Sequence, residues 1–98
     1  MRGSVELSSE ASTTVVALVG EFDLAVQDVL VECLESLQRR EPRQVVVDLT
    51  AATFIDSTVI NSLMAAHRDG LEIVIRGASG VPRRALEMLA IPGLPLLD

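Results

Sequence analysis

A chain of 98 residues has room for one small domain and not for two. Its net charge of −6 argues against nucleic acid or an anionic lipid surface as a direct partner. Its longest apolar runs are far shorter than the roughly 20 residues that a membrane span needs. The first residues carry no apolar stretch of the kind found in signal peptides. We therefore expect a cytoplasmic protein, formed by a single domain over residues 1–98 and built on the Val, Ile and Leu side chains in its 49% of hydrophobic residues.

The first half of the chain predicts a β-hairpin followed by a helix. A strand over residues 13–19 can pair with a shorter strand over residues 5–7 through a turn at residues 9–12. From Val26 onward the apolar positions recur at helical spacing, until Pro42 stops the helix.

The second half alternates strands and helices. In chain order, the apolar runs and helical stripes predict a strand, a helix, a strand, a helix and a short edge strand. These elements cover residues 44–49, residues 60–67, residues 71–75, the segment from Pro82 onward, and residues 93–97. Such alternation implies parallel pairing through right-handed crossovers. We therefore predict an α/β fold of order β-β-α-β-α-β-α-β, a small mixed sheet with an N-terminal hairpin and its helices packed largely on one side.

The most informative segment connects a buried strand to the second helix and ends in Asp56-Ser57-Thr58. A hydroxyl at a helix N-terminus can cap the helix. A phosphate placed there would meet the positive end of the helix dipole and free backbone N–H groups. The residues by themselves leave both interpretations open, a plain cap or a reversible phospho-switch.

The sequence gives little indication of a catalytic site or a metal site. Cys33 is the single cysteine and falls on the apolar face of its helix, which indicates an inert core residue and excludes an internal disulfide. His67 is the single histidine, and without a second His or a Cys in range it is not expected to bind a metal. Ser57 has no neighbouring base to activate it as a nucleophile. We predict a protein that is not an enzyme and that uses no metal and no cofactor.

Three stretches of the chain resemble the STAS domain family, especially the bacterial anti-sigma-factor antagonists. The first is Gly20-Glu21-Phe22-Asp23-Leu24-Ala25, before the first helix. The second is the strand Val46-Val47-Asp48-Leu49 together with Phe54-Ile55-Asp56-Ser57-Thr58, before the second helix. The third is the late turn and helix of residues 77–90. The resemblance covers essentially the whole chain in the right order. It implies a STAS fold and a protein that binds an anti-sigma factor, usually a serine kinase, and thereby releases a sigma factor.

The resemblance also implies roles for individual residues. Ser57 would be the phospho-acceptor, with Thr58 as the backup, and phosphorylation would break the complex until a phosphatase reset it. Asp23 and Asp56 would flank the hydroxyl and shape the contact with the partner. Val59 stands where the family usually has glycine, so it would fill the space through which a partner or kinase approaches. The free protein is expected to be a monomer.

Two other roles without catalysis stay open. Similar STAS subunits sit on the ATPase of bacterial phospholipid-transport ABC systems, where they support assembly as scaffolds. A decayed switch could also bind a kinase without accepting phosphate. For Asp23, Asp56 and Ser57, turn formation and helix capping remain the structural alternatives.

Overall fold

The computed structural model describes residues 3–10, 13–23, 26–40 and 44–89. In chain order, its elements are β1 (Ser4–Glu10), β2 (Thr13–Phe22), α1 (Gln27–Arg40), β3 (Gln44–Asp48), β4 (Ala52–Ile55), α2 (Ser57–Arg68), β5 (Ile73–Arg76) and α3 (Gly80–Leu89). The predicted α/β fold is confirmed. One additional short strand, β4, lies in the segment that the sequence predicted as a loop. The edge strand predicted at residues 93–97 lies outside the described residues.

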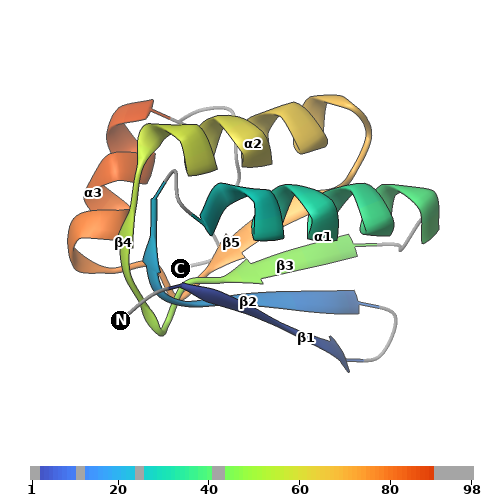
Figure 1. Cartoon of the computed structure of the whole chain (residues 1–98), viewed down its shortest axis with the longest axis horizontal. Coiled ribbons are helices and arrows are strands. Elements are labelled where there is room, and N and C mark those ends of the chain that lie inside the picture. Colours follow the sequence, from blue (N-terminus) through green and yellow to red (C-terminus); the bar gives the residue numbers. More distant parts are fainter. Residues whose placement is uncertain (1–2, 11–12, 24–25, 41–43, 90–98) are drawn as a thin grey trace.

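The described strands form one mixed sheet in the order β1-β2-β3-β5, with β4 paired to β2. The strands β1 and β2 form the predicted antiparallel hairpin, in register from Ser4 opposite Val19 to Glu10 opposite Thr13. The other strands pair in parallel. The helices α1 and α2 lie side by side over the sheet, and α3 packs against β4 at one end (Figure 1). Among the described residues, no helix is long and apolar enough to cross a membrane.

The strand β2 changes its pairing partner near Gly20. Residues 13–17 pair with β3, whereas residues 20–22 pair with β4, and the register shifts between Gly20 and Glu21. The φ angle of Gly20 is 89°, in the region that glycine adopts readily and other residues avoid. The sequence predicted a strand over residues 13–19 only, whereas β2 continues to Phe22. The glycine allows a bulge that directs the end of β2 toward β4 and the start of α2.

The core lies between the sheet and the helices, and its largest fully buried side chains include Phe22, Leu30, Ile60 and Leu63. Cys33 is half-buried and packs against this core rather than lying within it. Burial raises the pKa of its thiol, which disfavours the reactive thiolate and supports the predicted inert role.

Asp48 and Arg76 lie opposite each other and link β3 to β5. The Nε and Nη2 atoms of Arg76 both donate to Oδ2 of Asp48, at 3.2 and 3.0 Å. The Oδ1 atom accepts the backbone N–H of Thr50 at 2.9 Å. Burial by itself would raise the pKa of the Asp48 carboxyl, but the hydrogen bonds from Thr50 and Arg76 outweigh it. The pKa of Asp48 therefore lies below its usual value of 3.8.

We expect Asp48→Asn to lower the free energy of unfolding by about 1 kcal/mol at pH 7, allowing for solvent screening. Because folding lowers this pKa, the carboxylate stabilises the fold above its unfolded pKa of about 4, and the stabilisation is lost as the pH falls through the folded-state value. In urea unfolding, the gap between wild type and variant should be largest above about pH 5 and should shrink below about pH 4. Glu32→Gln, at an exposed position of α1, is the control. A gap for Asp48→Asn that stays constant from acid to neutral pH would contradict the explanation.

Candidate functional site

The parallel pairing of β2 and β4 brings together Asp23, which follows β2, and Asp56, which follows β4. Phe22 lies opposite Ile55, and the backbone N–H of Asp56 donates to the carbonyl of Phe22 at 3.2 Å. Asp23 directly follows β2 and Asp56 directly follows β4, so the two residues lie side by side at the carboxyl ends of these parallel strands. Residues 33 positions apart thus form one site, which the sequence suggested only through the family resemblance.

Asp56 is the N-cap of α2. Its backbone is extended, and its Oδ1 accepts the backbone N–H of Val59 at 3.1 Å. The same oxygen accepts the hydroxyl of Thr58 at 2.6 Å. The alternative in which Ser57 caps the helix is therefore wrong, because Asp56 occupies that position and already satisfies the backbone donor.

The two adjacent hydroxyls differ in their surroundings. Ser57 is the first residue of α2 and is exposed, and no hydrogen bond from the described part of the chain engages its hydroxyl. Thr58 is half-buried, and its hydroxyl is committed to Asp56. Ser57 is thus the more accessible of the two hydroxyls, a distinction that the triplet in the sequence could not supply.

A polar bridge connects the start of α2 to α1. The hydroxyl of Ser62 donates to the carbonyl of Thr58 at 3.0 Å, and Nε2 of Gln27 donates to Oγ of Ser62 at 3.0 Å. Sequence reasoning missed both Gln27 and Ser62. The spacing of four residues from Thr58 to Ser62 is a usable signal for the first bond. Nothing in the sequence indicates the second bond, because it joins two different helices.

The side chain of Val59 is fully buried, at 0% exposure, within the core. The expectation that it fills the outer space where a partner approaches is therefore wrong. The first turn of α2 presents Ser57 outward and Val59 inward. Val59 acts on the site through packing beneath it, and its side chain does not contribute to the accessible surface.

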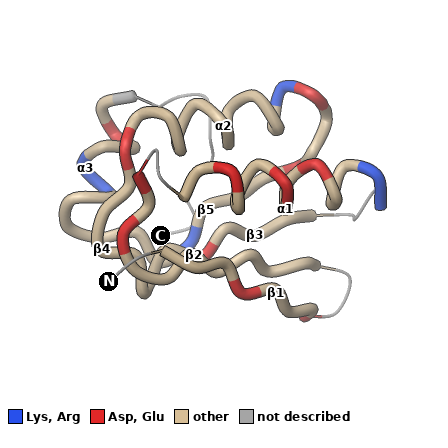
Figure 2. The backbone as a smooth tube through the Cα atoms, in the orientation of Figure 1, with Lys and Arg blue, Asp and Glu red and all other residues tan. Residues whose placement is uncertain are grey.

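The electrostatics of the site are acidic. Glu21 and Asp23 are exposed at the end of β2, and Asp56 is half-buried at the head of α2 (Figure 2). The helix N-terminus opposes them with a partial positive charge, which favours an anion on the first turn. An added phosphate would therefore be tolerated by the helix while increasing the negative charge that this surface shows to another protein.

One protein family matches nearly the whole chain. A family profile described as "Mlab, STAS domain" matches residues 5–98. No curated protein sequence is significantly similar to the chain.

Solved structures share the fold. An anti-sigma factor antagonist from Mycobacterium paratuberculosis superimposes with a TM-score of 0.90 at 20% identity, over 99% of this chain and 86% of that one. SpoIIAA in its unphosphorylated form gives a TM-score of 0.74 at 15% identity, over 97% and 88% of the two chains. Bacillus SpoIIAA in its phosphorylated form gives a TM-score of 0.72 at 14% identity, over 97% of this chain and 92% of that one. The profile spans nearly the whole chain and the fold agrees with it, so this protein belongs to the STAS domain family.

Proposed function

We propose that this protein is an anti-sigma-factor antagonist, which binds an anti-sigma factor and so frees a sigma factor for transcription. Family membership and the fold of the antagonists described above support this proposal. The partner is an anti-sigma factor of the serine kinase type, and a phosphatase acts on the modified form. The protein works in the cytoplasm, as a monomer when free.

Ser57 is the phospho-acceptor in this proposal. The observation that carries it is the contrast between two neighbouring hydroxyls, that of Ser57 exposed and that of Thr58 held by Asp56 at 2.6 Å. A kinase needs a hydroxyl that can enter its active site without first breaking a structural hydrogen bond. Thr58 would have to give up its contact with the cap residue, so it is the poorer acceptor.

The switch would work without refolding. Asp56 holds the first turn of α2 through its own carboxylate, so a phosphate on Ser57 need not replace any bond of the cap. The phosphate adds about −1.5 to −2 charges beside Asp23 and Asp56. At a close protein interface that charge and bulk oppose binding by several kcal/mol. Structures of SpoIIAA have been determined in the unphosphorylated and in the phosphorylated form, and both share the fold of this chain. This supports a switch that operates within one fold.

The buried position of Val59 favours kinase access. A side chain that lies in the core leaves the outer surface of the first turn to Asp56 and Ser57. The departure from the family's glycine therefore changes the packing under the site rather than the approach to it.

In this proposal the protein does not catalyse a reaction itself. His67 lies ten residues further along α2 than Ser57, roughly 15 Å along the helix axis, and its Nδ1 accepts the backbone N–H of Ile73 at 3.4 Å. Asp56 is engaged as a cap. Neither group is arranged to take a proton from Ser57, so Ser57 serves as a substrate for another enzyme.

The test is to incubate the protein with the anti-sigma kinases of its genome, ATP and Mg²⁺, and to measure intact mass and modified peptides. We expect one added phosphate, located on Ser57. It should be absent in Ser57→Ala and retained in Thr58→Val, which removes only the neighbouring hydroxyl. Phosphate on Thr58 would overturn the assignment of the acceptor. Binding to a kinase without phosphate transfer would indicate a switch that has decayed.

A second candidate function is a scaffold subunit of a bacterial phospholipid-transport ABC system. The observation that favours it is the description of the matching family profile, which names Mlab rather than an antagonist. If no candidate kinase binds or modifies the protein, while a transporter ATPase from the same genome co-purifies with it, this second function replaces the first.

A further inference from the structure

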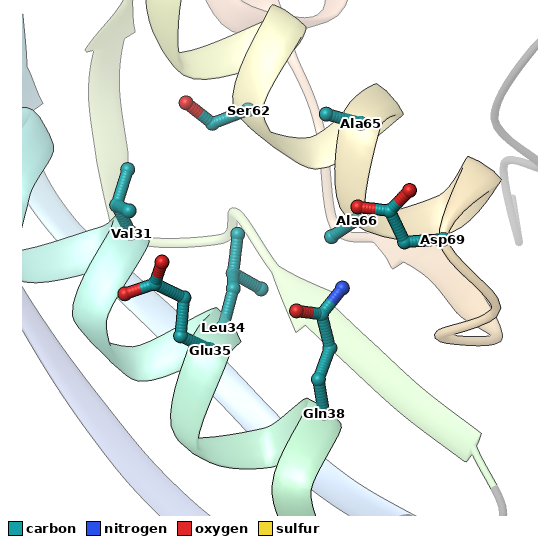
Figure 3. A pocket seen from close by; sticks show the side chains of 8 residues that line it. All are labelled: Val31, Leu34, Glu35, Gln38, Ser62, Ala65, Ala66 and Asp69. Carbon is teal, nitrogen blue, oxygen red and sulfur yellow. The ribbon is translucent and has the colours of Figure 1, made fainter.

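A groove lies between α1 and α2, away from the first turn of α2. Its volume is about 190 Å³. Both helices contribute side chains that face the gap (Figure 3). The groove is therefore large enough to accept one long side chain from another molecule.

The groove combines an apolar surface with acidic edges. Leu34, which is buried, and Ala65, which is half-buried, give apolar surface from the two helices. The charged side chains that line it are the exposed carboxylates of Glu35 on α1 and Asp69 at the end of α2. The amide of Gln38 points across the gap toward the α2 wall (Figure 3). The lining thus carries two negative charges, one on each side, and no positive one.

The surroundings extend this acidic character along α1. Exposed Glu32 and Asp28 stand about one and two helical turns before Glu35 on α1. The groove lies along the later turns of both helices, toward the ends where the helix dipole is negative. The arginines of the last turns, Arg39, Arg40 and Arg68, oppose this field but do not line the groove.

We propose that this groove binds the side chain of an arginine that a partner protein presents. The guanidinium group has five N–H donors in a planar fork that matches a carboxylate, so Glu35 and Asp69 are its candidate acceptors. Its aliphatic stem would cover the apolar surface of Leu34 and Ala65. A lysine ammonium is a compact point charge without this planar fork, so it matches a carboxylate less well. Arginine is also among the residues that most often dominate the binding energy of interfaces.

This proposal does not rest on the phospho-switch. Ser57 does not line the groove, and the groove meets the polar bridge of the site only at Ser62. The groove can therefore be tested with a defined probe and no kinase, so failure of one proposal leaves the other standing.

The test uses ¹⁵N-labelled protein titrated with the blocked peptide acetyl-Leu-Arg-Leu-amide and followed by two-dimensional NMR. The matched probe replaces arginine by citrulline, which has nearly the same shape and no charge. We expect the arginine peptide to bind at least ten-fold more tightly than the citrulline peptide. The amide signals that shift should be those of Leu34, Glu35, Ala65 and Asp69 and their neighbours.

Two variants sharpen the result. The double variant Glu35→Gln/Asp69→Asn should abolish the preference for arginine, while Glu6→Gln, which changes an exposed acid on β1 outside the groove, should keep it. Ala65→Met should block both peptides by filling the groove, with the fold checked from the unchanged signals of the sheet. Equal binding of the two peptides, shifts located elsewhere, or a preference that survives the double variant would each overturn the proposal.

Discussion

Replacing Ser57 by glutamate is expected to weaken binding of the anti-sigma partner by about 100-fold, or about 2.7 kcal/mol, while the fold stays intact. The new carboxylate would stand on the exposed first residue of α2, beside Asp56 and next to the turn that carries Asp23. A partner that has to approach this acidic surface closely would meet an additional like charge. A negative side chain on the first turn of a helix is favoured by the helix dipole, so we expect no loss of stability.

Titration calorimetry with the purified partner measures the change, and thermal unfolding by circular dichroism checks the fold. Ser57→Ala removes the hydroxyl without adding charge and should bind within a few-fold of wild type. Ser79→Glu places the same charge on an exposed serine just before α3, and should also leave binding unchanged. If the variants at positions 57 and 79 weaken binding equally, the effect comes from net charge and not from the site.

Restoring the family's glycine with Val59→Gly is expected to lower the free energy of unfolding by about 2–4 kcal/mol. Removing a fully buried valine side chain costs about 1.5–3 kcal/mol, and glycine is disfavoured in a helix by up to about 1 kcal/mol. In a small domain, whose total stability is about 5–15 kcal/mol, such a loss is readily measured by urea unfolding. The substitution should not increase the rate of phosphate transfer to Ser57 in the folded protein, because the side chain that it removes faces inward.

Val29→Gly is the matched control for this experiment. Val29 is 47% exposed on α1, so the same chemical change there removes helix propensity and little buried surface. We expect a loss of about 1 kcal/mol or less. Equal losses at positions 29 and 59 would mean that Val59 is not part of the core. Faster phosphate transfer in Val59→Gly would restore the view that this residue restricts access.

The sequence carried enough information for the elements and their order, because each depends on local periodicity. Alternating or continuous apolar residues indicate strands, and apolar residues at helical spacing indicate helices. The strand β4 was the exception. Four residues, of which only Ile55 is buried, give too short a pattern to recognise, and the strand exists because the bulge at Gly20 directs β2 toward it.

The candidate site was also predictable only in part. The Asp-Ser-Thr triplet at a predicted helix start indicated that Asp56, Ser57 and Thr58 belong to the site. Which residue caps the helix depends on where the helix begins, and which hydroxyl stays exposed depends on which face of the helix is buried. The helix begins at Ser57 and buries Val59 and Ile60 in the core, so tertiary contacts decided that the hydroxyl of Ser57 is exposed.

By itself, then, the sequence determined the α/β class, the hairpin, the positions of the helices and the Asp56-Ser57-Thr58 triplet at the start of the second helix. The tertiary structure alone decided that Asp23 lies beside Asp56, that Ser62 bonds to Gln27, and that α1 and α2 leave a groove with a carboxylate on each wall. The physical reason is that the spacing of apolar residues within one segment indicates which of its side chains are buried. Contacts between segments arise only when the whole core packs, because their geometry is set by every side chain in it.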